Sequence, residues 1–349
     1  MRPTIKVDRP STANALPENR PHFIDNFMSL FPLFEPADEL APQAARLAPR
    51  LRSLADRGVY FGTSSWKYEG WLGSVYKADR YLTRGRFSKK KFDAECLQEY
   101  AEVFPTVCGD FAFYQFPTPD YWKRLFESTP ESLLFGFKVP EDITVAKWPG
   151  HARYGERAGK ENKGFLDSNL FSSLFARRLD PYAARVATLI FEFGTFPKSL
   201  FPTPDDFLAR LDHFLQGLPE GFRYAVEIRN ADYLGPGYFS LLASRGVAHV
   251  FNAWTRMPEL GKQIELPDAF TADFTVVRAL LVKGRPYEQA VQTFEPYQEV
   301  QEPNPPVRDA LSRIARRAIE LRKPAFLFVN NRLEGNAPTT IESVVEMIE

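Results

Sequence analysis

The sequence predicts an α/β protein of the (β/α)8 class, a TIM barrel with an N-terminal extension. Segments with the composition of buried strands alternate with amphipathic helices from residue 59 to residue 349. Eight such strands are found, which is the number that closes a barrel of this type. The alternative is a doubly wound open sheet, but none of the strands is followed by a glycine-rich phosphate loop.

We assign residues 1–58 to the extension and residues 59–349 to the barrel domain. The first 36 residues are rich in Pro, Asn and scattered charge, which is typical of irregular chain. An amphipathic helix is predicted over Ala37–Arg57, where apolar residues recur every three or four positions, and Gly58 ends it. A short docked turn is expected before it, from apolar residues at helical spacing: Phe23, Phe27, Leu30, Phe31 and Phe34.

The eight predicted strands are short and rich in β-branched and aromatic residues, as buried strands are. They span Val59–Gly62, Thr106–Ala112, Leu133–Val139, Val186–Phe193, Tyr224–Arg229, Val247–Asn252, Thr275–Arg278 and Ala325–Asn330. Pro140 stops the third strand, since proline cannot donate to a sheet ladder.

The helices between the strands carry recognisable start signals. Thr118-Pro119-Asp120 and Thr203-Pro204-Asp205 each place a Thr cap before a first-turn Pro. The other predicted helices span Lys91–Phe104, Leu166–Leu179, Tyr238–Arg245, Val307–Arg322 and Thr339–Ile348. Glu141–Lys163 is predicted to be a long loop, and Lys283–Pro306 a mobile one.

The overall composition excludes several classes of protein. Forty-four basic and 44 acidic residues give a net charge of zero, so neither nucleic acid nor an anionic membrane is expected as a main partner. Two cysteines, Cys96 and Cys108, cannot build a disulfide framework or a four-cysteine zinc site. No secretory signal and no run of about 18 apolar residues is found, so a cytoplasmic location is expected.

The fifth strand carries an acid and a base at its C-terminal end. Glu227 and Arg229 are two residues apart, so their side chains share one face of the strand. Two charges at the end of a buried strand are costly unless they are paired or used. A structural ion pair and a functional site fit this stretch equally well.

Polar residues also lie at the C-terminal ends of the other seven predicted strands, where TIM barrels place their active sites. In chain order they are Ser64, Ser65 and Trp66, then Asp110 and Tyr114, Lys138, Glu192, Asn252, Arg278, and finally Asn330, Asn331 and Glu334. Polar strand ends are normally just solvated, so each residue alone is weak support for a site. Together they predict a ring around one barrel mouth.

Lys138 is the most informative residue of this ring. It lies between Phe137 and Val139 and faces the opposite way, into the predicted mouth. A lysine in that position needs a carboxylate or an anionic ligand. A salt bridge to Glu192 or Glu227 is the structural alternative.

Neither a metal motif nor a nucleophilic motif accompanies the ring. The four histidines, His22, His151, His213 and His249, form no known ligand spacing, and the last two are expected to be structural. A divalent metal held by Glu192 and Glu227 alone stays open as a cofactor but has no motif to support it. No GxSxG elbow occurs, and no cysteine has a histidine near it in the sequence.

An aromatic wall for a flat or sugar-like ligand could come from Trp66, Tyr68, Trp71 and Tyr114. Packing of these side chains beneath a loop is the structural alternative.

The chain resembles domain-of-unknown-function family 72, a family of TIM-barrel proteins. The resemblance runs from residue 59 to residue 349 and implies the barrel fold, without implying an activity. Its motifs, in the family's order, are Phe61–Trp66 with Trp71, Tyr100-Ala101 with Phe104–Val107, Phe113-Tyr114 with Pro117–Pro119, Phe135–Pro140 with Ile143-Thr144, Ala225–Arg229, and Asn330-Asn331 with Glu334-Gly335.

The chain also departs from that family's usual pattern. Cys108-Gly109-Asp110 stands where Glu-Ile-Asn is common, Glu192 replaces a Gln, and Asn252 replaces an Asp. The seventh strand is followed by Ala279 and Leu280 and lacks the usual His. These changes fit either an altered chemistry or a lost one.

Two hypotheses follow. The first is an enzyme that binds a small anionic substrate at the barrel mouth, with hydrolysis of a phosphate or sugar bond as one compatible reaction. Its expected catalytic residues are Lys138, Glu227 and Arg229, with Glu227 as base or metal ligand. Substrate-binding residues are expected to be Trp66, Tyr114, Arg278, Asn330, Asn331 and Glu334.

The second hypothesis is a non-catalytic binding or scaffold protein that kept the barrel after losing its chemistry. A third, a barrel nuclease, is disfavoured because the net charge is zero and the histidines are scattered. The sequence leaves the substrate, the reaction and the oligomeric state open.

Overall fold

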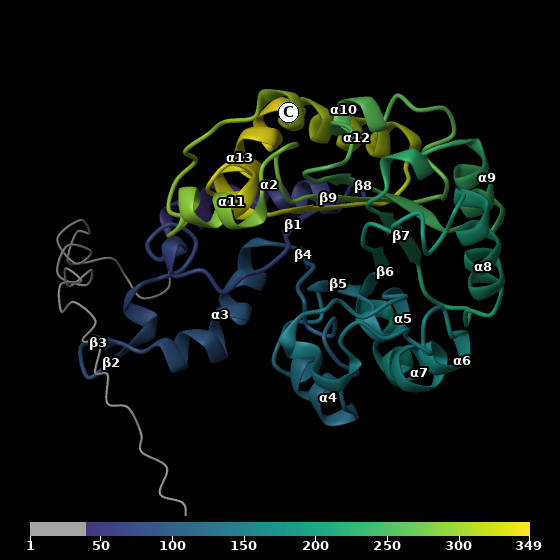
Figure 1. The fold of residues 1–349 in the computed structure, drawn as a ribbon. Coiled ribbons are helices and arrows are strands. Elements are labelled where there is room, and N and C mark those ends of the chain that lie inside the picture. The colour runs from purple at the N-terminus through teal and green to yellow at the C-terminus, as the bar shows by residue number, and fades with distance from the viewer. Residues whose placement is uncertain (1–39) are drawn as a thin grey trace, which may run out of the picture. The chain divides into compact units, whose positions relative to one another are not determined.

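The computed structural model describes residues 40–349, drawn as the coloured ribbon in Figure 1. The docked turn predicted from Phe23 to Phe34 and the first three residues of the predicted helix over Ala37–Arg57 lie outside the described residues.

Eight parallel strands close into a barrel in the order β1-β10-β9-β8-β7-β6-β5-β4, which confirms the predicted (β/α)8 class. The strands are β1 Val59–Thr63, β4 Thr106–Val107, β5 Leu134–Lys138, β6 Val186–Phe193, β7 Tyr224–Ile228, β8 Ala248–Ala253, β9 Thr275–Ala279 and β10 Ala325–Val329. Two short strands, β2 Leu82–Thr83 and β3 Arg86–Phe87, pair as an antiparallel hairpin outside the barrel.

Helices surround the barrel strands (Figure 1). They are α2 Pro42–Ala55, α3 Lys89–Val103, α4 Pro119–Glu127, α5 Glu141–Thr144, α6 Ser168–Phe171, α7 Arg177–Leu179, α8 Pro204–Gln216, α9 Pro236–Ser244, α10 Leu260–Gln263, α11 Tyr287–Phe294, α12 Pro305–Leu321 and α13 Ala337–Ile348. Both predicted Thr caps are present: Thr118 accepts from the Tyr121 amide, and Thr203 forms a capping box with Asp206.

Helix α2 packs against β1, α3 and α13. Its buried stripe consists mainly of Leu47, Leu51 and Leu54, at the spacing that predicted the helix. Arg46 and Arg50, on the same helix, pair with carboxylates of the C-terminal segment. The first and last described helices are therefore neighbours.

One strand prediction and two loop predictions need correction. The second strand is only two residues long and not seven, because the chain leaves the barrel wall after Cys108, whose amide makes the last ladder bond, to Thr63. The predicted mobile loop Lys283–Pro306 contains helix α11, whose Ala290 and Phe294 are buried in a small cluster of their own. The predicted loop Glu141–Lys163 contains α5 and a 3₁₀ segment, Ala152–Arg157.

Two apolar layers make the core. One fills the barrel interior with residues such as Ile190, Val250, Val276 and Phe328. The other lies between the strands and the surrounding helices and is much larger. The interior is tight: a Cβ added at Gly136 would lie 2.8 Å from the Phe328 ring.

Among residues 40–349, no helix combines the length and apolar character that crossing a bilayer would require.

His249 lies in the outer layer, buried between β8 and α9. Its Nδ1 is 3.1 Å from the Tyr238 hydroxyl, and its ring meets Phe239 and Phe251 edge-on. Burial lowers the pKa of this imidazole from 6.5 to about 3.

We expect His249 to make folding stability depend on pH. Unfolded chains protonate histidine near pH 6.5, whereas folded His249 stays neutral until about pH 3. The unfolded state therefore gains the extra proton, and stability falls as the pH drops through this window, by about 1.4 kcal/mol per pH unit.

Urea unfolding between pH 6.5 and pH 4.5 measures this slope. His249→Gln should reduce it by about that amount, whereas His213→Gln, at an exposed position on α8, should leave it unchanged. Equal slopes in the wild type and His249→Gln would contradict the assignment.

Candidate functional site

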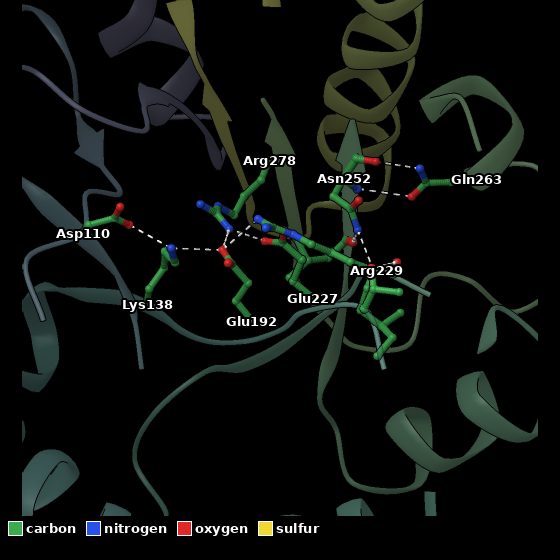
Figure 2. A network of polar contacts seen from close by, with 11 residues as sticks. Asp110, Lys138, Glu192, Glu227, Arg229, Asn252, Gln263 and Arg278 are labelled. Atoms are coloured by element: carbon green, nitrogen blue, oxygen red, sulfur yellow. Dashed lines mark hydrogen bonds and ion pairs between the residues drawn. The ribbon is translucent and has the colours of Figure 1, made fainter. Parts of the chain in front are cut away.

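The alternation of side chains along each strand places a layer of polar groups above the apolar barrel interior. Lys138 on β5, Glu192 on β6, Asn252 on β8 and Arg278 on β9 each lie two residues beyond an interior position. The same rule puts Glu227, two residues beyond Ala225 on β7, in this layer. The C-terminal strand ends therefore meet in one cluster, shown in Figure 2.

Glu192 is the centre of the cluster. One of its oxygens, Oε2, accepts a hydrogen bond from Arg278 at 2.6 Å and forms ion pairs with Lys138 at 3.1 Å and Arg229 at 3.0 Å. The three cations come from three different strands or strand ends. The carboxylate thus joins β5, β7 and β9 across the barrel mouth.

Glu227 binds the two arginines a second time. Its Oε1 accepts from Arg229 at 3.0 Å, and its Oε2 accepts from Arg278. The Arg229 guanidinium also lies 3.8 Å from the centre of the Trp254 ring. Both arginines are consequently fixed from more than one side.

Lys138 has a second carboxylate partner on the loop after β4. Asp110 Oδ1 is 2.9 Å from Lys138 Nζ, and the Phe113 ring lies 3.6 Å from the same nitrogen. Figure 2 shows Lys138 between Asp110 and Glu192.

Three carboxylates, Asp110, Glu192 and Glu227, therefore balance three cations, Lys138, Arg229 and Arg278.

Glu192 and Arg278 are held in their charged forms by their neighbours. Burial alone would raise the pKa of the Glu192 carboxyl, but Arg229, Lys138 and Arg278 outweigh burial and hold that pKa well below its usual range. Burial would lower the pKa of Arg278, and the carboxylates of Glu227 and Glu192 raise it above its ordinary value instead.

Neighbouring neutral groups complete the layer. Burial raises the pKa of the Cys108 thiol to about 12, so this cysteine is not a nucleophile at neutral pH. Gln263 on α10 holds the Asn252 backbone at both its amide and its carbonyl. Asn252 Oδ1 and Arg278 Nε are buried and have no hydrogen-bond partner among residues 40–349.

Of the residues predicted as catalytic or substrate-binding, the structure brings four into the cluster: Lys138, Glu227, Arg229 and Arg278. Asn330 lies at the mouth as well, where its amide donates to the Ser64 hydroxyl. Trp66 stacks on Phe111, with ring centres 4.5 Å apart. Tyr114 is exposed and meets the Arg153 guanidinium.

Two predicted substrate-binding residues lie apart from the cluster. Glu334 is fully buried and receives two donors from Arg308 and one from Thr340, which tie the end of β10 to α12 and α13. The Asn331 side chain accepts from the Ala337 amide at the start of α13. Both hold the loop after β10 in place.

Asp110, Glu192 and Trp254 belong to the cluster but were not among the predicted catalytic and substrate-binding residues. Asp110 and Glu192 were visible as polar groups at strand ends, and Glu192 as a partner for Lys138. Trp254 offered a weaker signal, an aromatic residue two positions after Asn252.

A divalent metal between Glu192 and Glu227 does not fit these residues. The two carboxylates face Lys138, Arg229 and Arg278, so a cation placed there would meet three positive charges. Within residues 40–349, no group of three or more His, Cys, Asp or Glu is arranged to share a metal ion.

Comparison with curated proteins finds the YecE protein of Escherichia coli K12, described as a UPF0759 protein, and its counterpart in strain O157:H7. Each is 24% identical over 189 residues, which are 54% of this chain and 55% of the relative. The chain therefore spans about half the length of the curated relatives it matches.

Solved structures support the fold. A DUF72 family protein from Thermotoga maritima matches with a TM-score of 0.55 and 20% identity, over 83% of this chain and 98% of that one. A DUF72 family protein from Enterococcus faecalis matches with a TM-score of 0.54 and 15% identity, over 82% and 95%.

The family model described as "Protein of unknown function DUF72" matches residues 60–349, nearly the whole barrel. The sequence match and the shared fold agree with each other, and the chain belongs to the DUF72 family.

Proposed function

We propose that the barrel mouth binds a small anionic substrate, which takes the place of the Asp110 carboxylate beside Lys138. The observation that carries the proposal is unequal burial. The Asp110 side chain is 47% exposed, whereas those of Lys138 and Glu192 are 7% and 8% exposed and that of Glu227 is fully buried.

Charge counting supports an exchangeable anion. Without Asp110, three cations face only the two carboxylates of Glu192 and Glu227, which leaves one positive charge in a buried place. Lys138 keeps its ion pair with Glu192, so the excess charge costs little stability, but it attracts a negative group to the half-exposed position beside Lys138. Asp110 supplies it in the free protein, and a substrate anion can supply it equally well.

Because Asp110 lies on a loop, a substrate anion can replace its carboxylate with little loss of stability. Asp110 lies beyond β4 and not within a strand, and within residues 40–349 Lys138 is the one residue with which it forms an ion pair. Glu192, by contrast, pairs with three cations and Glu227 with two. Removing either of them would disrupt the cluster, whereas moving Asp110 leaves the rest intact.

Hydrolysis is the reaction class we propose for this site. Lys138 would hold the substrate anion, and the released Asp110 carboxylate would take a proton from water as the water oxygen bonds to the substrate. The bond between the substrate and its leaving group breaks, and Asp110 passes the proton to the leaving group, which restores the carboxylate. Glu227 receives a positioning role here, because both its oxygens accept from arginine and its side chain is fully buried.

A second candidate function is a non-catalytic barrel. The observation that favours it is the charge balance of the cluster. All six charged groups are paired and their charges sum to zero, as in a purely structural network. The two candidates differ in whether Asp110 can be exchanged.

Inorganic phosphate serves as the probe for that exchange. Isothermal titration calorimetry should show weak phosphate binding to the wild type, and about tenfold tighter binding to Asp110→Asn, which removes the competing carboxylate. Lys138→Met should abolish binding. Lys147→Met, at an exposed lysine of the loop after α5, is the matched control and should bind as the wild type does.

Phosphate binding by Lys138→Met at the wild-type affinity would place the anion elsewhere. No binding by either the wild type or Asp110→Asn would favour the non-catalytic barrel.

The unequal burial of Glu192 and Asp110 also predicts that replacing them will reduce folding stability by unequal amounts. Glu192→Gln should lower the free energy of unfolding by about 3–5 kcal/mol, because it leaves three buried cations with one full carboxylate partner fewer. Asp110→Asn should cost only about 0–1 kcal/mol, since half of that side chain is in water.

Urea unfolding of both variants measures the difference, with circular dichroism as a check that each is folded. A loss for Asp110→Asn as large as that for Glu192→Gln would mean that Asp110 is a fixed structural partner, against the proposal.

A further inference from the structure

A cavity of about 430 Å³ opens between α3 and α4, next to the short strand β4. Its apolar wall includes Trp66, Phe111, Leu97 and Leu125, and Asp110 lies in its lining. The volume falls within the range of pockets that hold small molecules, about 300–1,000 Å³. Nothing described so far gives this space a role.

We infer that this cavity holds a flat ring of the substrate, whose anionic group binds Lys138. The inference rests on the proposed function and specifies its substrate class: an aromatic or similarly flat ring that carries one anionic group, such as an aryl phosphate or an aryl carboxylate.

The cavity and the cluster share one residue. Asp110 lines the cavity, and its carboxylate is 2.9 Å from Lys138 Nζ. An anion that replaces this carboxylate therefore stands at the cavity wall. The ring of the same ligand can then occupy the adjoining cavity, so only a short linker is needed between the ring and the anionic group.

The wall offers a fixed aromatic surface. The rings of Trp66 and Phe111 stack at 4.5 Å with an angle of 16° between their planes. Phe111 also meets Phe135 and Phe137 edge-on, with ring centres 5.6 Å away in each case. A Cβ added at Gly109 would come within 2.7 Å of the Trp66 ring, so the backbone lies close against this pair. Fixed rings of this kind favour stacking of a flat ligand.

The polar rim sets the substituents that the ring can carry. Lys67, Asp93 and Gln98 line the cavity beside the apolar wall. With Asp110 displaced, the charged residues of the lining are Lys67 and Asp93, one of each sign, and Asp93 pairs with Lys89 on the same helix. The lining then calls for no net charge on the ring itself. The single negative charge of the ligand then belongs at Lys138.

Three probes separate the two parts of the ligand: phenyl phosphate carries ring and anion, inorganic phosphate the anion alone, and phenol the ring alone. Calorimetry should show phenyl phosphate binding the wild type at least tenfold more tightly than inorganic phosphate. Ala94→Trp adds bulk at an exposed position of α3 that lines the cavity. It should remove this advantage while leaving inorganic phosphate binding unchanged.

A matched control adds the same bulk at an exposed alanine on another helix. Ala209→Trp, on α8 and outside the cavity lining, should bind all three probes as the wild type does. Lys138→Met should bind neither phenyl phosphate nor inorganic phosphate, but should bind phenol as the wild type does. Ala94→Trp should weaken any binding of phenol.

The outcomes are distinguishable. Equal affinity for phenyl phosphate and inorganic phosphate in the wild type would overturn the ring site and leave the anion site standing. A different result would support the ring site and overturn the proposed anion site. In that case phenol binds and Ala94→Trp weakens its binding, inorganic phosphate does not bind, and phenyl phosphate binds no more tightly than phenol. An unchanged phenyl phosphate advantage in Ala94→Trp would place the ring outside this cavity.

Discussion

The arrangement of the barrel mouth depends on the Glu192 carboxylate and the three cations that pair with it. Burying a carboxylate in a closed barrel costs desolvation free energy, and cations from other strands offset that cost. Lys138, Arg229 and Arg278 reach it because parallel strands end on the same side of the sheet. The charge layer is thus a product of barrel closure.

Four positions at which the sequence was expected to depart from the family pattern lie in or beside this layer: Cys108, Asp110, Glu192 and Asn252. Asp110 and Glu192 supply two of its three carboxylates, whereas Cys108 and Asn252 are neutral. These positions therefore bear directly on the charge balance of the mouth in this chain.

The sequence was sufficient for seven of the eight strands, to within one residue at each end, and for the direction in which their side chains point. Strand β6 occupies Val186–Phe193 as predicted, and the two-residue alternation correctly placed Lys138, Glu227 and Arg229 in one mouth. What periodicity could not supply was the course of the loops. The contact of Asp110 with Lys138 and the stacking of Trp254 on Arg229 depend on long-range packing that leaves no local repeat. Helix α11 was missed because it is short and lies among prolines and polar residues.

The pairing of β1 with β10 has a consequence for how the molecule forms. Ser64 and Asn330, which hydrogen-bond across this seam, are 266 positions apart in the chain. Contacts of such long sequence separation carry a large loop-closure entropy and slow the folding of a domain. On the ribosome, this edge of β1 must wait unpaired until β10 has been synthesised, and α2, which contacts β1, is already present by then.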